Sequence, residues 1–121
     1  MINIYLQQIA TSPVIQVLVP LMVLDYITGV IAATVTHTLS SKVGYKGFLK
    51  KITIVLGISA VAIVQTAIPD VPYLLTSFVL FFILNETLSI LENMDRAGIK
   101  LPSQLVRLLI SRRDQLDSDP E

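Results

Sequence analysis

The sequence predicts an all-α membrane protein with three transmembrane helices and a short amphipathic helix near the C-terminus. Two observations lead to this fold class. First, the stretch from Val14 to Leu91 is strongly apolar, and its formally charged residues are Asp25, Lys42, Lys46, Lys50, Lys51, Asp70 and Glu86. So few charges cannot cover a water-soluble core with a polar shell. Second, all nine Lys and Arg residues can be placed on one side of a membrane.

The distribution of basic residues predicts the topology. Four lysines lie between the first two apolar stretches, and the other basic residues follow the third: Arg96, Lys100, Arg107, Arg112 and Arg113. The N-terminal segment and the short link from Pro69 to Pro72 contain no Lys or Arg. Because cationic loops are retained in the cytoplasm, we expect the N-terminus outside and the C-terminus inside.

Composition argues against several classes of function. A chain of 121 residues forms at most one domain, and a formal net charge of +0 gives no reason to expect a nucleic-acid partner. The absence of Cys excludes disulfides, thiol catalysis and thiolate metal sites. We expect no signal peptide, because Met1 to Ser12 lacks Lys and Arg and no small-residue cleavage site follows a short apolar core. We also expect no cofactor.

Three segments are predicted to span the membrane, at about residues 14–35, 52–68 and 72–91. As an α-helix the first would be about 33 Å long, enough to cross a hydrocarbon layer of about 30 Å. The second is at the short end of the usual range. Pro69 and Pro72 disfavour helix continuation, so we expect a tight outer turn between the second and third spans.

The C-terminal part is expected to lie on the inner side. The third helix should stop at Gly98, which can adopt the left-handed cap, with Ile99 contacting Met94. An amphipathic helix at about residues 102–113 should lie in the headgroup layer, and the acidic tail 114–121 should be disordered. The basic residues expected at the membrane surface are Lys42, Lys46, Lys50, Lys51, Arg107, Arg112 and Arg113.

Small residues recur along one face of each of the first two spans. The first face carries Asp25, Gly29, Ala32 and Thr36, and the second carries Thr53, Gly57, Ala60, Val64 and Ala67. Small residues let helix backbones approach closely in lipid. Packing of three helices within one protomer and contacts between copies explain these faces equally well.

The third span is polar only in its inner half. Asn85, Ser89, Glu92 and Arg96 share one face, with Asn93 beside it. Continued outward, the same face carries Phe78 and Phe82. This helix alone therefore cannot line a wet channel across the whole membrane.

Two acidic residues lie at membrane depth and need partners. A charge near the middle of a span costs at least about 2.5–3.5 kcal/mol, and Asp25 is in this position. No lysine is expected at its depth, so we expect a polar contact between subunits or with pore water. Glu86 lies nearer the inner end, where Lys50 or Lys51 can reach it, and we expect a structural ion pair there.

The sequence contains no recognisable arrangement of catalytic residues. His37 follows the first span without a nucleophile or metal ligand nearby in sequence, and we expect a solvated loop residue. Gly44 and Gly47 do not match a phosphate-binding loop. We expect these glycines to form tight turns in a loop whose lysines face lipid headgroups. An enzyme is not expected.

Four ordered sequence blocks resemble phage holin family 4, a group that includes holin-like proteins linked to clostridial toxin secretion. The blocks are Leu24-Asp-Tyr-Ile-Thr-Gly29, Ser40-Ser-Lys-Val-Gly-Tyr-Lys-Gly47 with Lys50-Lys51, Asn85-Glu-Thr-Leu-Ser-Ile-Leu-Glu-Asn93 and Gly98-Ile-Lys-Leu-Pro102. They extend over most of the chain, from about Leu24 to Leu105.

The resemblance implies a small protein of the bacterial cytoplasmic membrane, usually phage-encoded, and implies no catalytic residues. Members are thought to accumulate and then oligomerise into lesions through which an endolysin, or in some cases a toxin, crosses. The characteristic positions here are Asp25, Gly29, Lys42, Lys46, Gly47, Asn85, Glu86, Ser89, Glu92, Asn93, Gly98 and Pro102.

The predicted function is therefore a holin-like pore former, with the lipid bilayer, further copies of the chain and a released protein as partners. Candidates for lining or packing the pore are Asp25, Gly29, Ala32, Thr36, Gly57, Ala60, Asn85, Glu86, Ser89, Glu92 and Asn93. Two alternatives stay open. One is a small oligomeric ion or solute channel with Asp25 and Glu86 on the ion pathway. The other is a membrane scaffold whose C-terminal helix recruits a partner.

Overall fold

The chain folds into five α-helices within residues 2–71 and 73–118, the parts that the structure, a computed structural model, describes. They are α1 (Ile2–Thr11), α2 (Pro13–Val35), α3 (Ser41–Ala67), α4 (Leu74–Arg96) and α5 (Ser103–Ser118). Helices α2, α3 and α4 are long and apolar enough to cross a membrane, as the sequence predicts. The side chains of six α5 residues lie outside the described part: Leu109, Arg112, Arg113, Leu116, Asp117 and Ser118.

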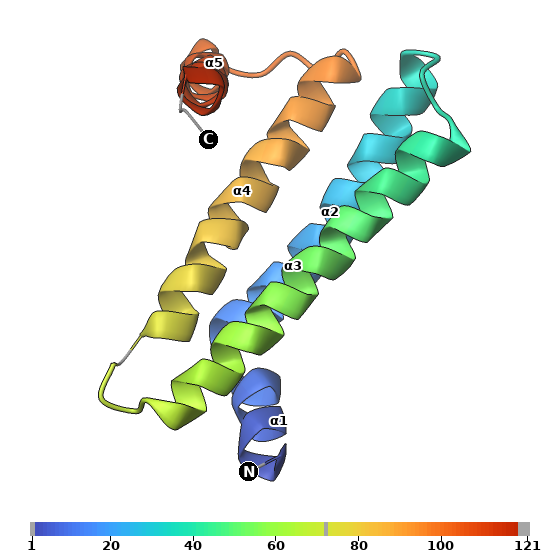
Figure 1. The fold of residues 1–121 in the computed structure, drawn as a ribbon. Helices are drawn as coiled ribbons and strands as arrows, with labels where there is room; N and C mark the ends of the chain where they lie inside the picture. The colour runs from blue at the N-terminus through green and yellow to red at the C-terminus, as the bar shows by residue number, and fades with distance from the viewer. Residues whose placement is uncertain (1, 72, 119–121) are drawn as a thin grey trace.

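The three long helices form one elongated bundle (Figure 1). Helices α2 and α4 run in the same direction, and α3 runs opposite to both. The contact between α2 and α4 is much more extensive than the contact of α3 with either. The protomer is thus a closely packed α2–α4 pair with α3 attached more loosely.

A small apolar core holds together the half of the bundle nearer α1. It consists of Ile15, Leu18 and Met22 from α2, Ile54, Ile58 and Ala62 from α3, and Leu75 and Val79 from α4. Most other large apolar side chains on the three helices are exposed, among them Val23, Leu56 and Phe81. In water such a surface would aggregate, but in a membrane it faces lipid tails.

Helix α3 begins at Ser41, eleven residues before the predicted second span. The Oγ atom of Ser40 accepts a hydrogen bond from the Val43 N–H at 3.2 Å, which caps the first turn. The expected loop with turn-forming Gly44 and Gly47 is wrong, since both glycines lie inside α3. The true α2–α3 loop covers residues 36–40, where the exposed His37 adopts a positive φ of 57°.

The predicted tight turn between the second and third spans is confirmed for its described residues, 68–71 and 73. The Val71 N–H donates to the Ile68 carbonyl at 3.2 Å. The side chain of Gln65 bridges the turn, because its Nε2 donates to the Val71 carbonyl at 2.8 Å and its Oε1 accepts from the Leu75 N–H at 3.2 Å. Pro72 lies outside the described residues.

The predicted stop after the third span is also confirmed. Helix α4 ends at Arg96, and Gly98 adopts a φ of +91°, which a residue with a side chain rarely tolerates. The Ile99 N–H then donates to the Met94 carbonyl at 3.0 Å, as in a Schellman cap.

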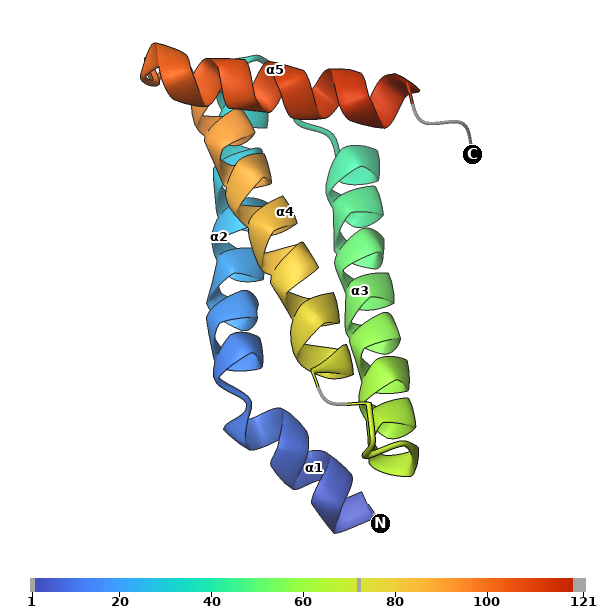
Figure 2. The same ribbon diagram turned by 90° about the vertical axis from the view of Figure 1, so that its left-hand side faces the viewer.

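The two terminal helices differ from expectation. Helix α1 is not among the predicted elements; it packs against α2 and α3 at the end of the bundle opposite α5, with Tyr5 and Ile9 against the core. Helix α5 lies across the opposite end of the bundle, roughly perpendicular to the three long helices (Figure 2). Helix α5 extends to Ser118, beyond the predicted end of the amphipathic helix at about residue 113, and no Gly or Pro interrupts it there. Residues 119–121 lie outside the described residues.

Candidate functional site

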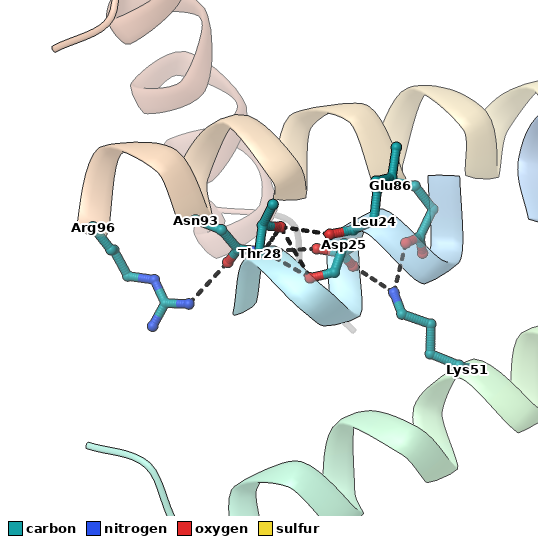
Figure 3. Close-up of polar contacts among 7 residues, drawn as sticks. All are labelled: Leu24, Asp25, Thr28, Lys51, Glu86, Asn93 and Arg96. Atoms are coloured by element: carbon teal, nitrogen blue, oxygen red, sulfur yellow. Dashed lines mark hydrogen bonds and ion pairs between the residues drawn. The ribbon is translucent and has the colours of Figure 1, made fainter. Parts of the chain in front are cut away.

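The candidate site is a polar network where the three long helices meet, in the half of the bundle nearer α5. Its centre is Lys51 of α3, whose Nζ atom donates to Asp25 Oδ2 of α2 and to Glu86 Oε2 of α4, the latter at 2.5 Å (Figure 3). The side chains are 18% exposed for Lys51, 11% for Asp25 and 2% for Glu86. One ammonium group thus joins one carboxylate from each of the other two spans.

Asn93 extends the network along the α2–α4 contact. Its Nδ2 atom donates to Asp25 Oδ1 at 2.9 Å, to the Asp25 carbonyl oxygen at 3.0 Å and to Thr28 Oγ1 at 2.9 Å. Its Oδ1 atom accepts from Arg96 Nη2 at 2.8 Å. Figure 3 shows the resulting chain of polar contacts, from Glu86 at one end to Arg96 at the other.

Helical periodicity explains how each segment contributes to the network. Glu86 and Asn93 are seven residues apart, so they lie on the same face of α4, two turns from each other. On α2, Gly29 follows Asp25 by one turn and leaves room for Asn93. A Cβ atom at Gly29 would lie 3.5 Å from Asn93 Nδ2, so a larger side chain would displace the amide.

The two carboxylates of the site share one counter-ion. Lys51 carries one positive charge against the two carboxylates of Asp25 and Glu86, and both carboxylates are largely withdrawn from solvent. An unpaired charge in a lipid-embedded protein is costly, and a paired one is tolerated only with good geometry. Removing Lys51 would therefore leave two like charges without a counter-ion between the helices.

The expected lysine partner of Glu86 is confirmed and is Lys51. The expectation that no lysine reaches Asp25 is wrong, because Lys51 binds this carboxylate as well. Position along each single span does not reveal this pairing. The longer α3 and the flexible lysine side chain bring the ammonium group to a position between the two acids. Asp25 is therefore satisfied inside a single protomer.

The two small-residue faces have different surroundings. The first faces α4, with Asp25 and Ala32 buried and Gly29 against Asn93, while Thr36 is exposed at the helix end. On the second face, Gly57 lies against the ring of Phe78. A Cβ atom at Gly57 would lie 3.6 Å from Phe78 Cζ. The rest of that face is exposed: Thr53, Ala60, Val64 and Ala67.

Several of the predicted residues gather around one pocket of about 530 Å³ between α3 and the α2–α4 pair. Its predicted members are Asp25, Gly29, Lys50, Lys51, Asn85, Glu86, Ser89 and Asn93. Glu92 is half-buried on α4 and does not line it, and Lys42, Lys46 and Arg107 are exposed elsewhere. The predicted surface positions of Arg112 and Arg113 fall on side chains outside the described part.

Sequence reasoning missed two contributors to the network as site residues. Thr28 accepts from Asn93, and its hydroxyl donates to the Leu24 carbonyl at 2.8 Å. Arg96 donates to the same asparagine from one turn further along α4. Thr28 lies one helical turn from Asp25, and Arg96 lies one turn from Asn93. This spacing is the sequence feature that could have identified them as site residues. In residues 2–71 and 73–118, no three His, Cys, Asp or Glu residues group as a metal site requires.

Comparison with known proteins decides the family. The model of the bacteriophage holin family matches residues 7–113, which is most of the chain. The chain belongs to the bacteriophage holin family. Holin-family proteins are membrane proteins and not enzymes, so this chain is a multi-pass protein of the bacterial cytoplasmic membrane without a catalytic site.

Curated relatives match most of the chain. A protein of Bacillus phage phi105 named "Probable holin" is 35% identical over 100 residues, which is 82% of this chain and 70% of the relative. An uncharacterized protein of Listeria monocytogenes is 35% identical over 96 residues, 79% of this chain and 69% of the relative. An uncharacterized 14.9 kDa protein of Clostridium perfringens is 32% identical over 98 residues, 80% and 74% of the two chains. No solved structure matches the chain.

Proposed function

We propose that the chain is a holin that oligomerises in the bacterial cytoplasmic membrane, permeabilises it and lets an endolysin or a toxin cross. Family membership and the phage relative named a probable holin support this function. The observation that carries the mechanism is the sharing of Lys51 by Asp25 and Glu86 at the junction of three spans. The groups of this network are buried in the single protomer, and they are available to face water in an open, oligomeric state.

A hole for a folded protein requires many copies of the chain. The three spans of one protomer pack on a common apolar core and enclose no channel of protein size. The exposed small face of α3, centred on Ala60, is the surface that we assign to contacts between copies. Small residues let helices of different protomers approach closely, and this is a main source of association in lipid.

Opening is proposed to begin with movement of α3. This helix contacts its neighbours less extensively than α2 and α4 contact each other, and Lys51 joins it by ion pairs to both. When α3 moves away in an assembly, the faces carrying Asp25 and Asn85 turn from protein contacts toward water. Polar groups in hydrocarbon seek partners, so this exposure is favourable in clusters and costly in single protomers.

The proposed orientation has the N-terminus outside and the C-terminus inside. The exposed Lys42 and Lys46 lie at the same end of the bundle as α5, which runs perpendicular to the spans, as a helix on a membrane surface does (Figure 2). Arg107 is exposed on α5 and is available to anionic lipid. The basic end would then face the cytoplasm.

Induced expression in a bacterium, with and without a cytosolic muralytic enzyme, tests the function. Optical density, membrane potential and release of a cytosolic marker protein are followed together. A holin abolishes the potential in both strains, releases the marker, and lowers optical density only when the enzyme is present. Depolarisation without marker release would instead establish an ion or solute channel. No leakage and no lysis would establish a scaffold.

A further inference from the structure

The pocket between α3 and the α2–α4 pair has features that the pore-forming function does not require. It lies where the basic ends of the spans meet, and it has about 530 Å³ of space, within the range of about 300–1,000 Å³ typical of small-molecule sites. Its apolar lining comes from Val30, Ala33, Leu39, Val43 and Ile54, and its polar lining from the network residues together with Lys50 and Arg96.

Two glycines inside α3 keep this pocket open. Gly44 and Gly47 both line it, and neither lies in a turn or has a positive φ. A Cβ atom at Gly47 would meet nothing within 4 Å, and one at Gly44 would lie 3.5 Å from the Tyr26 hydroxyl. Glycine inside a helix costs about 1 kcal/mol relative to alanine. Here the structural consequence of the two glycines is an empty volume beside the helix.

The charges around the pocket favour an anion. Lys50, Lys51 and Arg96 line it together with Asp25 and Glu86, so three positive charges face two negative ones. Both carboxylates are engaged by Lys51. The side chains of Lys50 and Arg96 are on exposed residues at its margin, and they carry the excess positive charge.

We propose that this pocket binds the headgroup phosphate of an anionic phospholipid from the adjoining leaflet. Lys50 and Arg96 would contact the phosphate, because cationic side chains form strong charge-assisted hydrogen bonds with phosphate oxygens. Val43 and Ile54 provide an apolar wall for the start of the acyl chains. Basic pockets between membrane helices are known binding sites for anionic headgroups. The proposal goes beyond pore formation and does not depend on it.

Lipid retention by the purified full chain tests the proposal. The protein is transferred into micelles that contain phosphatidylglycerol or phosphatidylcholine, and bound lipid is counted by native mass spectrometry. The wild type should retain one phosphatidylglycerol molecule in preference to phosphatidylcholine. The double variant Lys50→Gln/Arg96→Gln should weaken phosphatidylglycerol binding by at least about tenfold, since two charge-assisted hydrogen bonds are lost.

Two further variants make the test specific. Lys42→Gln/Lys46→Gln removes the same charge from exposed residues outside the pocket, and it should change retention by less than about threefold. Gly47→Leu adds volume to the pocket without replacing a charged residue, and it should lower retention as much as the Lys50/Arg96 variant. Circular dichroism confirms helix content in each case.

Three results would overturn the site. The first is equal retention of the two lipids by the wild type. The second is an equal loss in the Lys42/Lys46 control, which would mean general surface attraction. The third is full displacement by inorganic phosphate or glycerophosphate at the same concentration as the lipid, which would make the ligand a soluble phosphate. If Gly47→Leu does not fold, the Lys50/Arg96 comparison with its control still decides the question.

Discussion

The side-chain amide of Asn93 donates hydrogen bonds to both the carboxylate and the main-chain carbonyl of Asp25, at 2.9 and 3.0 Å, across 68 residues of sequence. This contact joins α4 to α2 at the depth where Lys51 joins α3 to both. The α2–α4 pair is therefore held together by the uncharged Asn93 amide and by the Lys51 ammonium group, which pairs with one carboxylate on each helix.

Replacing Asp25 by leucine should slow or abolish permeabilisation while membrane insertion stays intact. The change removes a polar group from the face that is proposed to turn toward water, so opening loses part of its driving force. Glu86 still binds Lys51 in this variant, which limits the damage to the closed protomer. Lysis timing after induction measures the effect, with the exposed Asp70→Leu as a matched control. Normal lysis timing in Asp25→Leu would remove this residue from the mechanism.

Replacing Lys51 by methionine should destabilise the folded protomer by about 3–5 kcal/mol, the usual cost of leaving buried charges without their partner. Asp25 and Glu86 would then face each other across the helix junction. Thermal unfolding in detergent measures the loss, and Lys46→Met, on an exposed residue, should have little effect.

Neutralising Asp25, Lys51 and Glu86 together should largely restore the stability that is lost in Lys51→Met. In the variant Asp25→Asn/Lys51→Met/Glu86→Gln no charge remains to be paired, and the amides keep hydrogen-bonding capacity. A triple variant that is as unstable as Lys51→Met alone would mean that the lysine acts through packing of its methylene groups rather than through its charge.

A cysteine at Ala60 should form disulfide-linked dimers between copies in the membrane, whereas a cysteine at Ala62 should not. Ala60 is exposed on the small face of α3, and Ala62 is 0% exposed and lies inside the protomer core. The wild-type chain contains no Cys, so each variant reports on one position. Oxidative crosslinking followed by gel electrophoresis gives the answer. Equal crosslinking at both positions, or none at Ala60, contradicts the proposed interface.

Single cysteines should also reveal the orientation. A cysteine at Asp70, in the exposed turn between α3 and α4, should react with a membrane-impermeant maleimide in intact cells. A cysteine at Lys46, at the basic end of α3, should react only after the cells are opened. The reverse pattern would place the N-terminus inside and would refute the assignment based on basic residues.

Much of the fold was predictable because it depends on local composition. The first span was expected at about residues 14–35 and α2 covers Pro13–Val35, since an apolar run bounded by Ser12 and Pro13 marks a helix start. The cap at Gly98 was also predictable, because a positive φ favours one residue type. The early start of α3 was not, since Gly44 and Gly47 are typical of turns until a helix around them is observed.

The candidate site was only partly predictable. A lysine partner for Glu86 followed from the general need to pair charges in a membrane. The pairing of Asp25 with the same lysine did not, because it depends on how far α3 leans toward the other two helices. The distinct surroundings of the two small-residue faces depend on helix rotation in the same way.

What the sequence determined by itself is the environment: three apolar spans, with the basic groups gathered at one end, require lipid around the helices. What the tertiary structure decided is which groups meet inside that lipid. The tertiary structure places Lys51 between two carboxylates, packs Gly29 against Asn93 and leaves Ala60 exposed on the surface of the bundle. Hydropathy and charge are properties of single segments, whereas tilt and rotation are set by packing between segments distant in sequence.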